Sequence, residues 1–476
     1  MNQGSEIRRL GQSVSRLAMP VLFEQICIVI MGMINTMLAA NLGKEAISAI
    51  GMVDTINNII ISFFSALAIG GTVVVAQYIG HNDPEKANQG AGQALISSLL
   101  IAILVTAAMF LTRNLLISAL FGEAEAAVLS AARDYFSVVL WSYIPIALVS
   151  IAFGILRGAG DTRTPMVVSI LMNFGNVIFS IVLIYGLNLE WGGLALRLPA
   201  LGVRGAAIGL TLARTAGLML VMIPLLRGSR LIRLGSLRHF RFDIDLLKCI
   251  FRLGVPASAE QLMFNGGKLI VQTFLVSLGT VAMAANSIAN SVTSLVMVPG
   301  SALSIAATTL VGQQIGRGQP KEAQKLLKFL VFSASAAIGM VSLLLLPFLN
   351  VLLRSYTQDP ATVAASKLVI ITYLAATPFF WPMSFIAPSG LRGAGDVRFT
   401  MLVSMISMWL LRILMGYVLT VILPLGVLGI WIAMYIDWLG RGAFFLRRMT
   451  GTRWMKGAVF EASSSDRDAA GISRLP

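Results

Sequence analysis

The chain has 476 residues, of which 57% are hydrophobic and only 12% are charged, and its formal net charge is +15. Soluble proteins carry roughly 25% charged residues, so this composition excludes a soluble globular domain. The basic residues lie in short segments between long apolar runs and form no single arm or face, which excludes a nucleic-acid-binding protein. Two cysteines, Cys27 and Cys249, are too few for a disulfide framework.

In chain order, residues 1–16 are predicted to form a polar cytoplasmic N-terminus without a cleavable signal peptide. Twelve apolar runs follow, and each is long enough for a helix that crosses a bilayer, which takes about 20 residues. They are too continuous for the alternating strands of a barrel. The runs cover residues 17–40, 50–78, 93–117, 131–156, 165–186, 203–226, 254–277, 285–312, 327–350, 365–390, 399–423 and 426–446.

The distribution of lysine and arginine predicts the orientation of these spans. With a cytoplasmic N-terminus, the inner segments hold 23 Lys and Arg residues and the outer segments hold 7. Inner loops of membrane proteins are the basic ones, so both termini are predicted to be cytoplasmic. A basic cytoplasmic linker is expected over residues 227–252, and residues 449–476 are expected to form a cytoplasmic, disordered tail.

The two halves of the chain repeat each other at an offset of 236 residues. Pro20 and Glu24 fall on Pro256 and Glu260, and the segment AQYIGHNDPEKA (76–87) falls on GQQIGRGQPKEA (312–323). LRGAGDTR (156–163) matches LRGAGDVR (391–398) at an offset of 235. We therefore predict an all-α polytopic membrane protein of twelve transmembrane helices. They form two six-helix lobes, residues 17–226 and 253–448, which are related by pseudo-two-fold symmetry.

These repeated motifs resemble the multidrug and toxic compound extrusion (MATE) transporter family, over roughly residues 10–450. The segment YIDWLGR (435–441) resembles the bacterial branch of DinF-like and YeeO-like exporters. The resemblance implies secondary active efflux by alternating access, in which a proton or sodium ion is exchanged for an amphipathic compound such as a drug, dye or flavin. It implies a monomer in the bacterial inner membrane, which needs no cofactor and is not an enzyme.

The sequence departs from the family pattern where many members carry acids. Asn35 and Ser180 stand at usual aspartate positions of spans one and five, and Trp381 stands where some members have an acid in span ten. An alternative function is a lipid-linked precursor flippase of a related fold, because Arg214, Lys268 and Arg412 supply cations at membrane depth.

Acids within the spans are candidate sites, because an ionised group at membrane depth costs several kcal/mol and is usually functional. Glu260 is the first candidate for coupling, and its repeat equivalent Glu24 is the second. Asp437 and Arg441 have the spacing of an intrahelical ion pair on the last span, so a structural role is favoured over a gate. Asp54 lies near the outer start of span two, where an interfacial role is favoured over a cation site. Asp437 and Asp54 are nevertheless the next candidates for cation coupling after Glu260 and Glu24.

Other polar or flexible residues of the spans are predicted to line the substrate cavity. Glu24, Met31 and Asn35 recur on nearly one helical face. Lys268 lies two turns beyond Glu260, as a counter-charge or a contact for an anionic substrate. No spacing typical of a metal site or a catalytic motif is present. The predicted cavity residues are Asn35, Met31, Gln25, Gln261, Asn173, Asn176, Lys268, Arg214 and Arg412.

Overall fold

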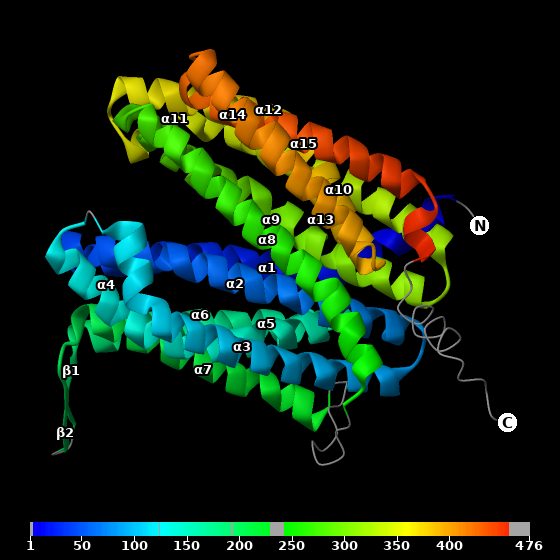
Figure 1. Ribbon diagram of the computed structural model, residues 1–476, viewed down its shortest axis with the longest axis horizontal. Helices are drawn as coiled ribbons and strands as arrows, with labels where there is room; N and C mark the ends of the chain where they lie inside the picture. Colours follow the sequence, from blue (N-terminus) through cyan, green and yellow to red (C-terminus); the bar gives the residue numbers. More distant parts are fainter. Residues whose placement is uncertain (1–2, 123, 192–193, 229–241, 457–476) are drawn as a thin grey trace. The chain divides into compact units, whose positions relative to one another are not determined.

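The computed structural model describes residues 3–122, 124–191, 194–228 and 242–456 (Figure 1). Much of the predicted linker (229–241) and most of the predicted tail (457–476) therefore lie outside the described residues.

The first half of the chain folds into the six predicted spans, and its helices follow the continuous apolar runs. Pro84, Glu125 and Gly186 lie at the ends of such runs, where the helices begin or stop. A two-stranded antiparallel ribbon joins the last two helices. The elements are α1 (Gln3–Ala40), α2 (Lys44–Gly80), α3 (Pro84–Phe121), α4 (Ala126–Val139), η1 (Leu140–Ser142), α5 (Tyr143–Gly158), α6 (Arg163–Tyr185), β1 (Leu187–Trp191), β2 (Leu194–Leu198) and α7 (Gly202–Arg227).

The second half repeats this order of helices, with one irregular span. The eleventh span, residues 397–422, alternates between α-helix and wider π-helical turns. The elements are α8 (Ile244–Ser277), α9 (Thr280–Gly316), α10 (Pro320–Leu345), η3 (Leu346–Phe348), α11 (Leu349–Tyr356), α12 (Pro360–Gly393), α13 (Val397–Ile406), η4 (Ser407–Ile413), α14 (Leu414–Tyr417), η5 (Val418–Ile422), α15 (Gly426–Thr450) and η6 (Arg453–Lys456).

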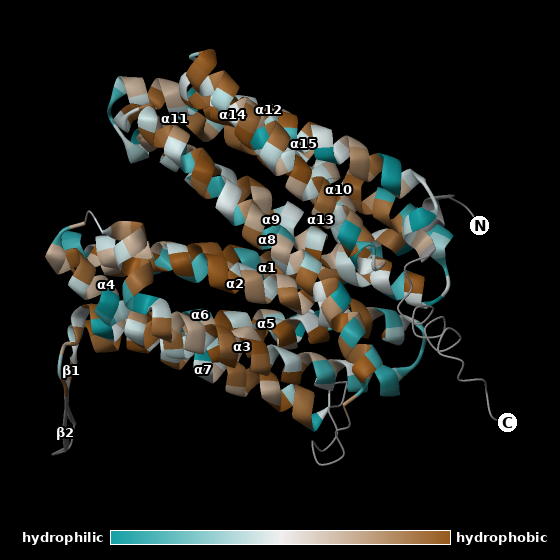
Figure 2. Ribbon diagram, in the orientation of Figure 1, coloured by the Kyte–Doolittle hydropathy of each residue, from teal (hydrophilic) through white to brown (hydrophobic). Residues whose placement is uncertain are grey.

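Within the described residues, ten helical segments are long and apolar enough to cross a membrane. Hydrophobic residues cover most of their length, and hydrophilic residues gather near many of the turns (Figure 2). The other two predicted spans are α8 and α15. Helix α8 carries Glu260 and Lys268 in its middle turns, and α15 carries Asp437 and Arg441. The prediction of an all-α polytopic membrane fold is confirmed.

The chain divides into two compact units. Unit 1 comprises Met1–Leu22, Val73–Asp83 and Phe251–Pro476, and unit 2 comprises Phe23–Thr72 and Pro84–Ile250. In unit 1, α9, α10, α12 and α15 pack around a core that includes Ala307, Leu327, Ile386 and Trp431. In unit 2, α5 packs against α3 and α7, and α6 packs along α7. The predicted lobe boundaries stay a prediction.

The repeat also appears as a close helix crossing inside unit 1, between the ends of α2 and α9. A Cβ atom added to Gly80 would lie 2.2 Å from the carbonyl oxygen of Gln313. A Cβ atom on Gly316 would lie 2.0 Å from the carbonyl oxygen of Gln77. These two contacts are reciprocal in the repeat, since 77 and 80 correspond to 313 and 316 at the offset of 236. Only glycine permits backbones to approach so closely.

Candidate functional site

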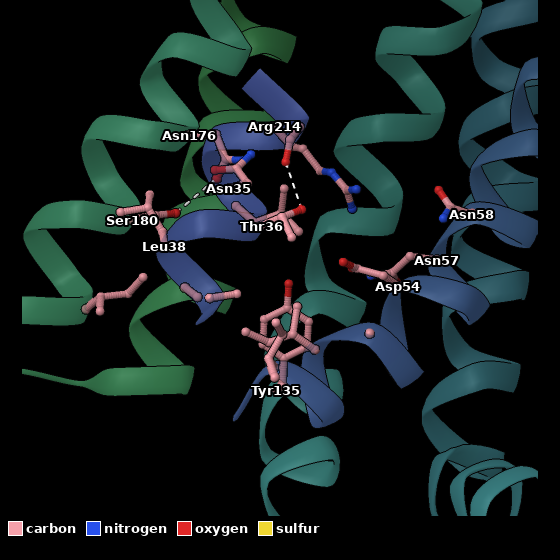
Figure 3. A pocket seen from close by; sticks show the side chains of 18 of the residues that line it. Asn35, Thr36, Leu38, Asp54, Asn57, Asn58, Tyr135, Asn176, Ser180 and Arg214 are labelled. Carbon is pink, nitrogen blue, oxygen red and sulfur yellow. Dashed lines mark hydrogen bonds between the residues drawn. The ribbon is translucent and has the colours of Figure 1, made fainter. Parts of the chain in front are cut away.

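Unit 2 contains a cavity of about 390 Å³ between its helices (Figure 3). Its lining is rich in amides and hydroxyls, and it includes five of the residues that the sequence analysis singled out. The polar lining residues are Asn35 and Thr36 of α1, Asp54, Asn57 and Asn58 of α2, Tyr135 of α4, Asn176 and Ser180 of α6, and Arg214 of α7. A volume of this order suits a small ligand or several waters.

Asp54 and Arg214 supply the charges of this lining. Figure 3 shows the carboxylate of Asp54, the guanidinium of Arg214 and the hydroxyl of Tyr135 pointing toward one open region. Arg214 is 7% exposed, and its Nη1 donates to the Ser142 hydroxyl at 2.6 Å. Tyr135 is 4% exposed. The sequence predicted an interfacial role for Asp54 and did not predict this cavity. In the structure the Asp54 carboxylate faces buried polar groups from three other helices.

Two hydrogen bonds in series position the Asp54 side chain. The Tyr143 hydroxyl of α5 donates to Asn57 Oδ1 at 2.7 Å, and Asn57 Nδ2 donates to Asp54 Oδ1 at 3.3 Å. Asn57 and Tyr143 are both buried, so the carboxylate is positioned by residues that are themselves fixed. Asn57 and Tyr143 were not predicted from the sequence, because their hydrogen bond joins residues that lie far apart in the chain.

The two positions where family members carry acids open onto the same cavity. Asn35 and Ser180 both line it, and the Ser180 hydroxyl donates to Asn176 Oδ1 at 3.2 Å. Neither residue brings a charge. The carboxylate of this cavity belongs to Asp54 on α2, whereas the family's usual acidic positions lie on α1 and α6.

Glu24 lies in the same unit but is already paired. Its side chain is 3% exposed, and Nη2 of Arg157 donates to both carboxylate oxygens at 2.7 and 2.8 Å. Arg157 belongs to the first LRGAGD motif, so this ion pair ties α1 to the end of α5. The ion pair with Arg157 therefore gives Glu24 a structural role.

Unit 1 contains the equivalent ion pair. Nη1 of Arg392, in the second LRGAGD motif, donates to both oxygens of Glu260 at 3.3 Å. The side chain of Glu260 is 13% exposed, and this contact is longer than the one at Glu24. Neither Arg157 nor Arg392 was predicted from the sequence to be the partner of a glutamate. The repeat contained the signal, because the two acids recur at an offset of 236 residues and the two arginines at an offset of 235.

A second group of charges surrounds the Phe264 ring in unit 1. Asp437 Oδ2 lies 3.8 Å from both Arg441 Nη2 and Arg412 Nη1, so the predicted pair of Asp437 with Arg441 is present and is shared with Arg412. The Ser407 hydroxyl donates to Asp437 Oδ1 at 2.5 Å. This group brings together four of the residues singled out in the sequence: Asp437, Arg441, Arg412 and Lys268. The Lys268 ammonium lies 4.9 Å from the Phe264 ring centre.

The remaining sequence candidates lie apart from the cavity of unit 2. Gln25, Met31 and Asn173 are partly buried but are not among its described lining residues, and Asn173 Nδ2 donates to the Ser169 carbonyl at 2.8 Å. Gln261 belongs to unit 1. Trp381, at the family's third acidic position, stacks on Phe385 with ring centres 4.7 Å apart. No group of three or more His, Cys, Asp or Glu side chains that could hold a metal occurs in the described part of the chain.

Comparison with known proteins agrees with the repeat and with the helical fold. The MatE family model matches residues 20–182 and again 256–418, two segments displaced by the same 236 residues as the repeat. The probable multidrug resistance protein NorM of Thermotoga maritima is 28% identical over 457 residues, which are 95% of each chain. The uncharacterized transporter YisQ of Bacillus subtilis is 27% identical, over 93% of this chain and 95% of its own.

Among solved structures, a MOP superfamily transporter from Pyrococcus furiosus superposes with a TM-score of 0.81 at 21% identity. The superposition covers 94% of this chain and 98% of that one, which supports the fold. Two family matches cover both halves of the chain, and the relatives match it almost from end to end. The chain therefore belongs to the MATE family of membrane transporters and is a transporter, not an enzyme.

Proposed function

We propose that this chain exports amphipathic organic compounds in exchange for protons, and that Asp54 carries the coupling proton. Export follows from family membership and from the relative named as a multidrug resistance protein. The same relatives favour an exporter over a flippase for lipid-linked precursors. Drugs, dyes and flavins are the candidate substrates.

The observation that carries the assignment to Asp54 is its place in the cavity of unit 2. Glu24 and Glu260 are bound by arginines, and Asp437 lies between two arginines and accepts a hydrogen bond from Ser407. Asp54 instead accepts from a neutral amide and faces the cavity. Its charge can therefore change without breaking one of these ion pairs.

Protonation of Asp54 changes the charge balance of the cavity. With Asp54 ionised, its negative charge and the positive charge of Arg214 cancel. After a proton binds, Arg214 is left as the charged residue of the lining. A conformation that brings the cavity into contact with one side of the membrane binds the proton with a different affinity from one open to the other side. Coupling can be no stronger than this difference.

The chemistry of the cavity favours a proton over sodium. One carboxylate, with amide and hydroxyl oxygens around it, supplies a single negative charge, and Arg214 opposes a bound cation. A proton needs only the carboxylate oxygen. Sodium coupling is the outcome that would correct this part of the proposal.

The direct test uses purified protein in liposomes with a fluorescent cationic dye and a flavin as substrates. Proton and sodium gradients are imposed separately. A gradient of one pH unit supplies about 1.4 kcal/mol per proton, enough to concentrate a neutral substrate about tenfold if one proton is exchanged. Substrate accumulation against its own gradient with the pH gradient, and none with the sodium gradient, is expected. The reverse result would assign sodium, and failure with both gradients for every substrate tested would contradict coupled export.

We further propose that the protein acts as a monomer in the bacterial inner membrane with both termini in the cytoplasm. The excess of Lys and Arg in the inner segments supports this orientation. Reporters fused after residues 235 and 455 are expected to report the cytoplasm, and one inserted near residue 190 the opposite side. A periplasmic signal from the reporter at 235 would overturn the orientation.

A further inference from the structure

Three cationic side chains converge on one aromatic ring inside unit 1. The centre of the Phe264 ring is 4.9 Å from Lys268 Nζ, 5.6 Å from the Arg412 Cζ and 5.7 Å from the Arg441 Cζ. The cations come from α8, from the π-helical segment η4 and from α15. An aromatic face attracts each cation but cannot cancel their mutual repulsion.

The acids around this cluster do not balance its charge. Asp437 lies among the cations, and Glu260 is bound by a fourth cation, Arg392. Four positive charges (Lys268, Arg392, Arg412 and Arg441) therefore face two negative ones, which leaves a net charge of +2. A positive excess at membrane depth is costly unless an anion offsets it.

Several buried donors in the cluster also lack a hydrogen-bond acceptor among the described residues. The Arg441 side chain is 4% exposed, and neither its Nε nor its Nη2 has a hydrogen-bond partner in the described part of the chain. Within the same residues, the Nε of Arg412 also has no partner. The single nearby carboxylate does not satisfy them, because Asp437 Oδ2 is 3.8 Å from each arginine, beyond hydrogen-bond distance. Buried donors without acceptors are rare and require an explanation.

The exposure of the cationic side chains decreases from the edge of the cluster toward its interior. Lys268 is exposed on unit 1, the Arg412 side chain is 12% exposed, and Arg441 is buried behind them. Arg412 lies in a π-helical segment, a distortion that recurs at functional sites. A ligand that enters past Lys268 would meet the free guanidinium donors behind it.

We propose that this cluster is a binding site for the anionic group of an amphipathic organic molecule: a carboxylate, sulfonate or phosphate attached to an aromatic or apolar body. Oxyanions of this kind accept from guanidinium groups in two parallel hydrogen bonds, and the Arg412 and Arg441 donors are available for them. Phe264 provides an apolar surface for the body of the ligand. Export of the bound anion rests on the proposed function, whereas binding of the anion at this site does not.

The test measures binding alone, so that it can succeed or fail independently of ion coupling. The full-length protein is placed in phosphatidylcholine nanodiscs and titrated with three pyrene probes of matched shape. One carries a butanoate group, one a neutral butanol and one a butyl-trimethylammonium group. The anionic probe is expected to bind at least about tenfold more tightly than the neutral one, and added salt should weaken it.

Two variants and one control locate the site. Lys268→Gln should weaken binding of the anionic probe about fivefold, and Arg412→Gln about tenfold or more, with the neutral probe unaffected. Lys367→Gln removes an exposed lysine of the same unit from α12, outside the cluster, and should change nothing. The thermal unfolding temperature of each variant in the nanodisc verifies that it is folded. Lys268 is exposed, so its variant is interpretable even if the arginine variant is unstable.

The source of the anion is settled by repeating the titration with phosphatidylglycerol in the nanodiscs. Unchanged probe affinity would assign the site to a soluble organic anion, and loss of probe binding would assign it to an anionic lipid headgroup. Equal affinity for the three probes, or an anionic preference that survives both substitutions, would overturn the proposal. Probe binding without pH-driven transport would leave the site in place and reject the coupling mechanism instead.

Discussion

Replacing Arg157 with methionine tests whether the Glu24–Arg157 pair is structural or part of coupling. Methionine keeps an unbranched stem of similar reach but removes the two charge-assisted hydrogen bonds to Glu24, at 2.7 and 2.8 Å. The Glu24 side chain is only 3% exposed, so water cannot replace the guanidinium. Breaking a buried pair from one side in this way costs about 3–5 kcal/mol.

The assay is thermal unfolding of the purified protein in one detergent. At about 2.1 cal/mol/K per residue, the 476-residue chain loses about 1 kcal/mol of stability per degree. Arg157→Met should therefore lower the Tm by about 3–5 °C. Glu24→Gln should cost less, because the Arg157 side chain it leaves behind is 16% exposed and can reach water. The double variant should be more stable than Arg157→Met alone, since it has no unpaired buried charge.

The equivalent pair in unit 1 provides the internal comparison. Arg392 and Glu260 are 3.3 Å apart with side chains 18% and 13% exposed, so Arg392→Met should lower the Tm less, by about 1–3 °C. An unchanged Tm in Arg157→Met, together with complete loss of transport, would refute the structural interpretation and return Glu24 to the coupling candidates.

Two further predictions concern stability. Gly80→Ala should destabilise the protein by about 1–3 kcal/mol, because the new methyl group would lie 2.2 Å from the Gln313 carbonyl oxygen. The control is Gly51→Ala on the same helix, which has open space around it and should be neutral or stabilising. Equal effects of the two substitutions on the Tm would contradict the close crossing of α2 and α9. Hydrogen bonds from the Thr362 side chain and backbone hold the pKa of Asp359 below its ordinary value at the start of α12. The stabilisation from Asp359 should therefore be complete above about pH 4 and disappear as the pH falls through the lowered pKa. Asp359→Asn should remove this pH dependence from the Tm, and an unchanged acid dependence would contradict it.

Much of the fold could be predicted because its signals are local. A run of apolar residues long enough for a bilayer forms a helix whatever it packs against, and the repeated motifs preserve their register across both halves. The LRGAGD motifs also behave alike, since Gly160 and Gly395 adopt nearly the same left-handed backbone, with φ of 92° and 94°. The β1–β2 ribbon was not predicted, because its strands lie outside the apolar runs from which the helices were assigned.

The candidate site was harder to predict because its charges are balanced by residues far away in the chain. Glu260 and Glu24 were ranked first and second from their membrane depth and their equivalent repeat positions, but the partner of each lies more than 130 residues away. Asp54 was ranked as interfacial because it is near the start of an apolar run. Its contact with the cavity depends on how α2, α6 and α7 pack, which periodicity does not reveal.

The exchange of Asp54 for asparagine tests the central claim most directly. Asparagine keeps the size of the side chain and an oxygen that accepts from Asn57, but it cannot take up a proton. Asp54→Asn in liposomes should still exchange substrate across the membrane when there is no gradient, and should fail to accumulate it against a concentration difference under an imposed pH gradient. Glu260→Gln, measured beside it, should keep pH-driven accumulation. Wild-type accumulation in Asp54→Asn, or its loss only in Glu260→Gln, would contradict the assignment of the coupling proton to Asp54.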